Sequence, residues 1–253
     1  MKTLRFFIVI LFFSASSISL FAEKLVFFTE EFPPYNYTQD LKHQGVSVEI
    51  LEAMMKKVGM KYKIISLPWA RAYKRSQEKE NSFIFSITRN AKRENSFKWI
   101  GSIVPSIQSV YALKNRADIK IERLEDLKNY QIGTTINDSR ETYLLEKGFN
   151  LNDFQRVAGK NSYLQNYKKL KKQRIDLWPI NNAVMNYLVD KTGDDPKKVL
   201  RKVFEFSEIS SDGFYIAASL STKPKVVEKM RKVLEDLKKT TEYQMILKKW
   251  GFN

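Results

Sequence analysis

Predicted strands and helices alternate along almost the whole chain, and this feature restricts its fold most. The segment Leu25 to Thr29 is a predicted strand, and a helical apolar stripe from Val46 to Val58 follows, closed by Gly59. The order recurs through the strand "KYKIISL", the helix "PWARAYKRSQEK" and the strand "SFIFSIT", and resumes at "EDLKNYQIGTT". This alternation predicts an α/β fold with mainly parallel sheets.

The alternation breaks twice, at 106–115 and at 204–219, where extended segments lack an intervening helix. Two breaks suit a chain that crosses into a second lobe and later returns. We therefore expect lobe one to comprise 24–111 and 212–253 and lobe two 112–211, with crossings at Tyr111 to Asn115 and Ser207 to Phe214. Ligands of open α/β sheets bind beyond the carboxyl ends of the strands, so we expect the site in a cleft between the lobes.

Residues 1–22 have the layout of a cleavable secretory signal. Lys2 and Arg5 precede an apolar run from Phe6 to Phe13, and small residues follow up to Ala22. The apolar run is shorter than the roughly 20 residues that a membrane span needs. No later segment of the sequence is long and apolar enough to cross a bilayer. We therefore expect an exported, periplasmic protein without stable membrane insertion. The sequence has no cysteine for a lipid anchor, so we do not expect a lipoprotein.

The composition also argues against several function classes. Without cysteine, and with His43 as its single histidine, the sequence offers no His/Cys zinc site, and a Ser-His-Asp triad is improbable, so we expect no metal and no cofactor. The formal net charge of +16 invites a nucleic-acid interpretation. However, the basic residues are dispersed, and in 223–239 the apolar residues recur at helical spacing and leave the lysines outside. We expect no nucleic-acid partner.

Two arginines fall in the first turns of predicted helices that follow strands. Asn90 can cap a helix that contains Arg93, and Asp138 can cap one that contains Arg140, with Glu141 completing a capping box. A cation in a first turn is locally unfavourable. A bound carboxylate would reverse that cost, because a guanidinium can bond both of its oxygens beside the free N–H groups. The alternative is that Asp138 and Glu141 are structural and that Arg140 points to water.

Two tryptophans lie at predicted strand ends. Trp69 and Arg71 follow Pro68 directly after one strand, and Trp178 ends the strand "RIDLW". Exposed aromatic rings there can stack on a solute or hold a cation, although ordinary core packing is the alternative. We expect Trp69, Arg71 and Trp178 to converge on one cleft with the two arginines.

The order of these motifs resembles the bacterial extracellular solute-binding proteins of family 3, the polar amino-acid-binding type associated with ABC importers. The resemblance covers nearly the whole mature chain. It implies the type II periplasmic-binding fold, in which two α/β lobes, joined by a hinge of two crossing strands, close on a small solute. It rests on "FTEEFPPYNY", "LPWARAY", "FSITRNAKRENSFKWIGSI", "YQIGTTINDSRE", "RIDLWP" and "GFYIAAS".

The resemblance implies roles for residues of the first lobe. Arg93 stands where the family's arginine grips the α-carboxylate of the solute. Asn90 stands near the family's helix-capping hydroxyl, and Thr88 is one of the hydroxyl residues that end the preceding strand. Phe32 and Tyr35 match the aromatic loop that lines the pocket.

The second lobe departs from the family pattern. Asn137 and Asp138 occupy the places of a glycine and a hydroxyl residue that hold the same carboxylate. Asn181 falls roughly where amino-acid binders carry the acid that neutralises the α-ammonium. The resemblance thus implies a solute-binding protein and leaves the amino-acid identity of the solute open.

We expect a monomeric binding protein that captures a small polar, carboxylate-bearing solute, an amino acid or a related compound, and delivers it to an ABC-transporter permease. One alternative is an enzyme on the same fold that resembles cyclohexadienyl dehydratases. It would need a carboxyl group of raised pKa, for which Glu30, Glu31 and Asp138 are the candidates. The other alternative is a sensory receptor that reports to a membrane partner.

Overall fold

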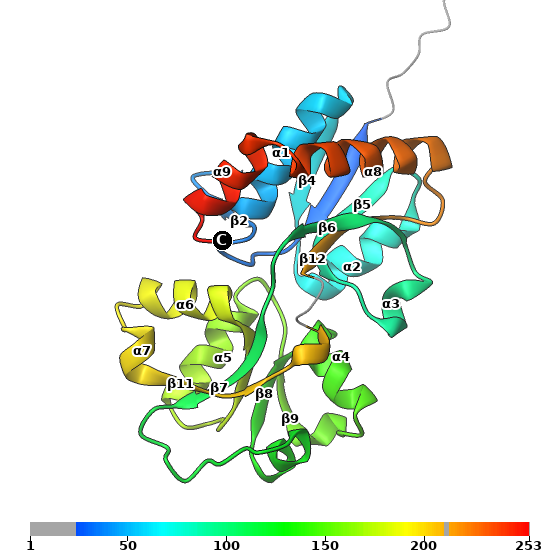
Figure 1. The fold of residues 1–253 in the computed structure, drawn as a ribbon. Coiled ribbons are helices and arrows are strands. Elements are labelled where there is room, and N and C mark those ends of the chain that lie inside the picture. Colours follow the sequence, from blue (N-terminus) through cyan, green and yellow to red (C-terminus); the bar gives the residue numbers. More distant parts are fainter. Residues whose placement is uncertain (1–23, 210–212, 253) are drawn as a thin grey trace, which may run out of the picture.

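The structure, a computed structural model, describes residues 24–209 and 213–252. Their strands pair into separate sheets that lie in two lobes, the upper and lower bodies of Figure 1. The predicted signal, residues 1–22, lies outside the described residues. In the part of the chain that is described, every helix is too short or too polar to cross a membrane.

The first lobe contains a five-stranded sheet in the order β4-β1-β5-β12-β6. β1 runs parallel to β4 and β5, as the strand and helix alternation predicts. β12 comes from the C-terminal part of the chain and inserts antiparallel between β5 and β6. The chain therefore returns to the sheet in which it began. The strands are β1 (Leu25–Thr29), β4 (Tyr62–Ser66), β5 (Ser82–Thr88), β6 (Lys98–Val104) and β12 (Phe214–Ala218).

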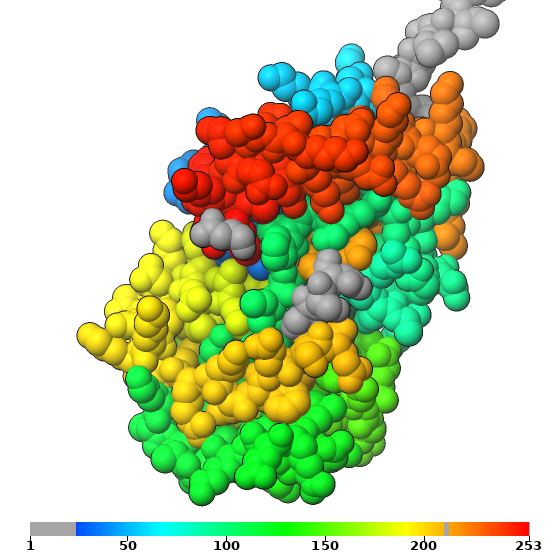
Figure 2. All heavy atoms as spheres, in the orientation of Figure 1, coloured from blue at the N-terminus to red at the C-terminus, as the bar shows by residue number. Residues whose placement is uncertain are grey.

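Helices cover both faces of this sheet. α1, α8 and α9 pack together on one face, where Figure 2 shows α8 and α9 in orange and red, and α2 packs against β1 and β5. The predicted stripe from Val46 to Val58 is confirmed as α1, and Gly59 ends it at φ 70°. The helices and the small hairpin are α1 (Val46–Val58), α2 (Trp69–Glu78), α3 (Ala91–Glu94), α8 (Pro224–Lys238), α9 (Thr241–Lys249), β2 (Tyr37–Gln39) and β3 (Lys42–Gln44).

The second lobe is built from smaller sheets that are partly antiparallel. β7 lies between β10 and β11 and runs antiparallel to both, whereas β8 and β9 form a parallel pair. The expectation of mainly parallel sheets is thus wrong for this lobe. Its elements are β7 (Gln108–Leu113), β8 (Ile132–Thr135), β9 (Phe154–Val157), β10 (Trp178–Asn181), β11 (Leu200–Glu205), α4 (Ser139–Glu146), α5 (Ser162–Lys171), α6 (Asn182–Lys191), α7 (Pro196–Val199), η1 (Leu124–Asn129), η2 (Leu151–Asp153) and η3 (Ser207–Ile209).

The first crossing differs from the predicted position. β6 ends at Val104 and β7 begins at Gln108, so the chain changes sheets at 105–107 rather than at Tyr111 to Asn115. The physical reason is that β7 is buried along its whole length as the central strand of the second lobe's antiparallel sheet. The predicted return crossing lies between the end of β11 and the start of β12, and residues 210–212 within it are outside the described part.

Candidate ligand-binding site

A small cavity lies between the two lobes. The carboxyl ends of β1 and β5 and the starts of α2 and α3 meet the N-terminal ends of α4 and α5 there. Its volume is about 10 Å³, which is room for about one water molecule. Side chains of the two lobes therefore fill most of the cleft. The lining residues are Glu30, Phe32, Trp69, Ser86, Thr88, Arg93, Asp138, Ser139, Arg140, Tyr163 and Phe214.

Arg93 is placed in the cleft by a very short helix. The side chain of Asn90 caps α3 as predicted, accepting a hydrogen bond from the backbone N–H of Arg93 at 3.1 Å. The guanidinium turns inward and is 3% exposed. Its Nη1 donates to the carbonyl of Thr88 at 3.1 Å, and its Nη2 donates to the carbonyl of Asn137 in the other lobe at 3.3 Å.

The buried charge of Arg93 is held by aromatic rings and backbone carbonyls, although the charge of Asp138 also acts on it and opposes the lowering of its pKa by burial. Its guanidinium carbon lies 5.0 Å from the ring centroid of Trp69 and 5.4 Å from that of Tyr73. Among the residues that the structure describes, no carboxylate forms an ion pair with it. Burial lowers the pKa of Arg93, yet a guanidinium stays protonated at neutral pH. A buried cation held only by carbonyls and rings is suited to bind an anion.

Arg140 is buried too, but it is neutralised within its own lobe. Asp138 caps α4, accepts from the backbone N–H of Arg140 at 2.8 Å and forms an ion pair with its guanidinium. Nη1 of Arg140 donates to Oε1 of Gln108 at 2.7 Å, so the side chain does not point to water. The predicted capping box does not form, because Asp138 accepts from the N–H of Arg140 rather than from that of Glu141, and Glu141 accepts from the N–H of Asn137 rather than from that of Asp138.

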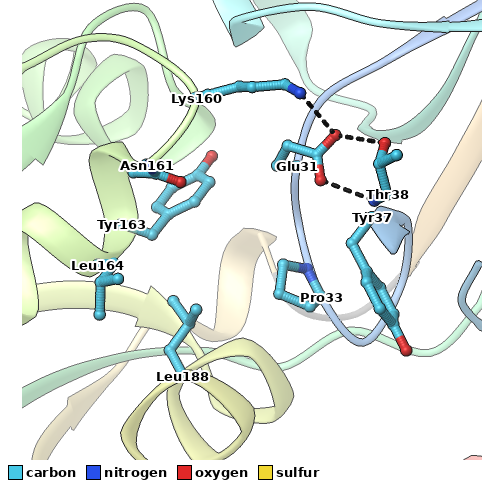
Figure 3. Close-up of a pocket in the computed structure, with 9 residues that line it drawn as sticks. All are labelled: Glu31, Pro33, Tyr37, Thr38, Lys160, Asn161, Tyr163, Leu164 and Leu188. Atoms are coloured by element: carbon cyan, nitrogen blue, oxygen red, sulfur yellow. Dashed lines mark hydrogen bonds and ion pairs between the residues drawn. The ribbon is translucent and has the colours of Figure 1, made fainter. Parts of the chain in front are cut away.

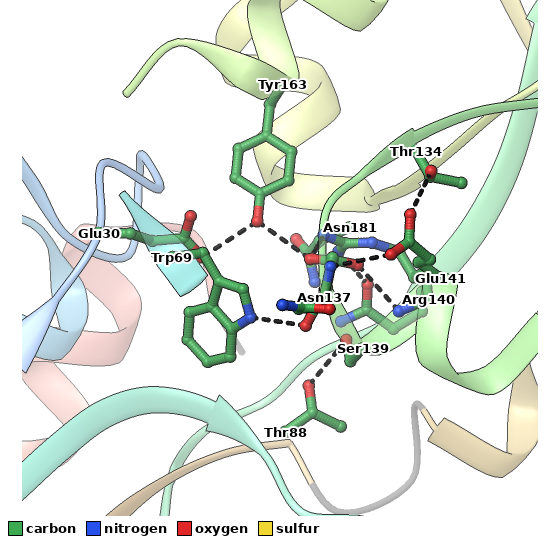
Figure 4. Close-up of polar contacts among 12 residues, drawn as sticks. Glu30, Trp69, Thr88, Thr134, Asn137, Ser139, Arg140, Glu141, Tyr163 and Asn181 are labelled. Carbon is green, nitrogen blue, oxygen red and sulfur yellow. Dashed lines mark hydrogen bonds and ion pairs between the residues drawn. The ribbon is translucent and has the colours of Figure 1, made fainter. Parts of the chain in front are cut away.

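Two acidic groups of the cavity lining meet at one tyrosine hydroxyl. The hydroxyl of Tyr163 lies 3.0 Å from Oε1 of Glu30 and 3.0 Å from Oδ2 of Asp138 (Figure 4). Glu30 directly follows β1 in the first lobe, whereas Tyr163 and Asp138 belong to α5 and to the cap of α4. Burial, and then the charge of Asp138, raise the pKa of Glu30 to about 8, so most of it is protonated at neutral pH.

Further contacts join the two lobes across the cavity. Nε1 of Trp69 donates to the carbonyl of Asn137 at 2.8 Å, and the hydroxyl of Thr88 donates to that of Ser139 at 3.4 Å (Figure 4). The buried hydroxyl of Ser86 has no hydrogen-bond partner among the described residues, and its residue has a φ of 58°. The cleft thus holds at least one buried polar group that a ligand could satisfy.

A second, larger pocket adjoins the first, and Tyr163 contributes to the walls of both (Figure 3). Its volume is about 180 Å³. Although burial opposes it, hydrogen bonds from Ser66 and Thr38 lower the pKa of Glu31, which stays ionised in this pocket. The pocket is lined by Glu31, Pro33, Tyr37, Thr38, Lys160, Asn161, Tyr163, Leu164 and Leu188.

Six of the residues predicted for the site lie around the small cavity, and Trp178 and Arg71 do not. Trp178 was predicted to end a strand, but it is the first residue of β10. Its ring is fully buried and packs against Tyr167, with 5.6 Å between the ring centroids. Arg71 follows Trp69 by two positions on α2, about 200° around the helix, and therefore lines a groove on another face. The six residues at the cavity are Phe32, Trp69, Thr88, Arg93, Asp138 and Arg140.

Three other predicted residues are not among those that line the cavity. Tyr35 is 1% exposed, stacks on Phe32 and donates to the carbonyl of Pro105 at 3.2 Å. Asn181 caps α6 and donates to the hydroxyl of Ser106 at 3.2 Å, so it does not face the cavity. Asn90 caps α3, as described above. Their side chains support the site through packing and capping.

Five lining residues were missing from the predicted site. Glu30 and Ser86 lie at the carboxyl ends of strands, and Ser139 follows a predicted cap, so these three had a positional signal. Tyr163 and Phe214 had none, because Tyr163 reaches the cavity from α5 of the second lobe and Phe214 reaches it through the antiparallel pairing of β12 with Thr88 of β5.

Two α/β lobes, two crossings between them and a buried arginine in the cleft define a periplasmic-binding protein of the type II fold. Residues 25–253 match the bacterial extracellular solute-binding proteins, family 3, and the chain belongs to this family. No curated protein matches the chain. Within the described residues, no group of three or more histidine, cysteine, aspartate or glutamate side chains could hold a metal ion.

Several solved structures share the fold at low sequence identity. The arginine-, lysine-, histidine-binding protein ArtJ from Geobacillus stearothermophilus is similar at 21% identity and a TM-score of 0.73, over 90% of this chain and 95% of that one. The substrate-binding protein of an amino acid ABC transporter is similar at 20% identity and a TM-score of 0.72, over 90% of this chain and 99% of that one. A histidine kinase sensor domain with similarity to periplasmic binding proteins is similar at 18% identity and a TM-score of 0.76, over 89% of this chain and 94% of that one.

Proposed function

We propose that the protein captures a small polar solute that bears a carboxylate, an amino acid or a related compound, in the periplasm and delivers it to an ABC importer. The observation that carries the proposal is Arg93, a buried guanidinium that forms no ion pair with any carboxylate of the described residues. A solute carboxylate would pair with this charge, and the hydroxyls of Ser86 and Thr88 beside it can donate to the same group. Glu30 also lines the cavity and is not paired with Arg140, so its carboxyl group, when ionised, can bind a cationic end.

Capture requires the lobes to separate. A cavity of about 10 Å³ cannot hold an amino acid, so the solute would enter after Trp69 has left Asn137 and Thr88 has left Ser139. Contacts to both lobes then give the solute a higher affinity for the closed form, which shifts the population toward closure. We expect the protein to work as a monomer.

The enzyme alternative has one observation in its favour and two against it. Glu30 has the raised pKa that an acid catalyst needs. An elimination also needs a base, but Asp138 is engaged by Arg140 and Glu31 lies in the adjoining pocket, held by Thr38 and Ser66. We therefore propose binding without chemistry.

A sensory role is the second candidate, and the similarity to a histidine kinase sensor domain supports it. Both roles use the same capture step. A binding assay with a candidate permease, alongside a search for a membrane-bound kinase partner, separates them.

A matched set of solutes tests the capture step. We would measure thermal unfolding of residues 24–253 with an amino acid, the acid that lacks its amine and the amine that lacks its carboxylate. A ligand at 100 times its Kd stabilises by about 2.7 kcal/mol. We expect stabilisation by at least one carboxylate-bearing solute and none by its decarboxylated partner. If only decarboxylated amines stabilise the protein, the role proposed for Arg93 is wrong.

A further inference from the structure

One hydroxyl hydrogen lies between two carboxyl groups that belong to different lobes. The Tyr163 hydroxyl is 3.0 Å from Glu30 of the first lobe and 3.0 Å from Asp138 of the second. A phenol has one hydrogen to donate, so it can satisfy only one of the two acceptors if both are ionised. The other carboxylate would then face an oxygen lone pair in a buried site, which is costly.

A proton on Glu30 resolves this conflict. The Glu30 carboxyl then donates to the oxygen of Tyr163, and Tyr163 donates to Asp138. The remaining charged groups near Glu30 do not replace this proton, because Arg140 from α4 is paired with Asp138, and Arg93 from α3 donates to backbone carbonyls. Tyr163 itself comes from α5, so the chain of donors joins the end of β1 to α5 and to the cap of α4 in the second lobe.

We propose that Glu30, Tyr163 and Asp138 form a proton latch, in which closing of the empty cleft takes up one proton at Glu30 and opening releases it. The inference rests on the proposed function only in taking the lobes to open and close. In the open cleft Glu30 would be exposed to water and separated from Tyr163 and Asp138. Neither burial nor the charge of Asp138 would then favour the protonated form of Glu30.

The pH range of the latch follows from the change at Glu30. Its pKa is about 8 in the closed cleft, from burial and from Asp138, against an ordinary value of 4.5. The pKa is raised on closing, so the proton's contribution to closure is fully present below about 4.5 and is lost as the pH rises to about 8. The ratio of closed to open protein should fall by about tenfold per pH unit within this range. Closure of the empty cleft would compete with solute capture most strongly at acidic pH.

The experiment uses the fact that the sequence contains no cysteine. Lys92→Cys and Lys172→Cys place one label on each lobe at exposed positions, so energy transfer between two fluorophores reports the separation of the lobes. Transfer is measured without solute from pH 5 to 9 in the parent protein and in the Glu30→Gln and Glu31→Gln variants. Glu31 is the matched control for the pH dependence, because it is adjacent in sequence and lies in the other pocket with a lowered pKa; loss of its ion pair with Lys160 of the second lobe, at 3.8 Å, would change the ratio equally across this pH range.

We expect the parent and Glu31→Gln to open with rising pH, with a ratio that changes by about tenfold per unit and levels off near pH 8. Glu30→Gln should lose this dependence, since its amide does not titrate. The latch is overturned if the parent cleft stays closed, or stays open, at every pH. It is also overturned if Glu30→Gln shows the same pH dependence of energy transfer as the parent. Should that variant fail to fold, a Glu30 carboxyl that titrates near 4.5 by carbon-13 NMR in the closed parent overturns it equally. No solute is used, so a failed latch leaves the solute assays above to decide the proposed function.

Discussion

Replacing Arg93 with alanine should separate a ligand-binding arginine from a structural one. Arg93 is 3% exposed, and it contacts two backbone carbonyls and two aromatic rings while forming no ion pair within the part of the chain that the structure describes. The matched control is Arg71→Ala, which removes the same side chain from the same lobe at an exposed position away from the cavity.

The expected loss of binding is large. A solute carboxylate that pairs with Arg93 would lose a charge-assisted contact in a buried site, which costs about 2–5 kcal/mol. This corresponds to a drop in affinity of tens-fold to thousands-fold. Arg71→Ala should change the affinity by less than about threefold, since surface substitutions away from a site are usually within about 0.5 kcal/mol.

The empty protein should be affected much less. The variant loses two hydrogen bonds of about 0.5–1.5 kcal/mol each and ring contacts of about 0.5–2 kcal/mol. It also removes a buried charge without an acidic partner, and burial of such a charge costs several kcal/mol. The contributions oppose each other, so we expect a net change of less than about 2 kcal/mol in unfolding. The helix-dipole cost inferred from the sequence is minor here, because α3 is a single turn.

Titration calorimetry with a solute found in the thermal screen, alongside thermal unfolding of the empty variants, measures both quantities. Unchanged affinity in Arg93→Ala would show that the arginine does not contact the solute. An apo protein destabilised by more than about 2 kcal/mol would show that the arginine is a structural residue.

Three further substitutions test residues away from the cavity. Trp178→Ala should lower the free energy of unfolding by about 3–5 kcal/mol, measured by urea denaturation, because it empties a fully buried position. Asn181→Ala should cost about 0.5–2 kcal/mol in the same assay through loss of the α6 cap, while solute affinity at a permissive temperature stays within a few-fold. Gly45→Ala should cost about 1 kcal/mol or more, since its φ is 122° and a Cβ would lie 2.3 Å from the carbonyl oxygen of Tyr35; unchanged thermal unfolding would contradict this.

Local signals in the sequence were sufficient for individual elements. The apolar stripe and Gly59 predicted α1, and Asn90 and Asp138 were predicted as caps that the structure confirms. These signals depend on bonds within a few residues. The two breaks in the strand and helix alternation predicted a second lobe, and the family resemblance added the type II periplasmic-binding fold.

The errors fall where strand pairing decides the outcome. Trp178 was placed at a strand end, but it begins β10 and pairs with Tyr111 of β7, so its side chain enters the core. The same pairing assigns β7 to the second lobe and moves the first crossing to 105–107. The sequence of a short apolar segment does not show which strand it will pair with. A shift of a few residues in the position of a strand changes which side chains face the cleft.

The two arginines show the same limit for side-chain roles. Both lie in first turns of helices, after predicted caps, so their spacing alone does not distinguish them as ligand contacts, and only the family resemblance favoured Arg93. The structure distinguishes them by their acids, because Asp138 neutralises Arg140 and leaves Arg93 with carbonyls and rings. A cation that is already paired gains little from a second anion, whereas an unpaired buried cation gains most of the Coulombic energy and loses none of an existing bond. The carboxylate of a solute should therefore bind Arg93. A cationic end of the same solute should pair with an acid that is not already paired with Arg140, and that acid is Glu30.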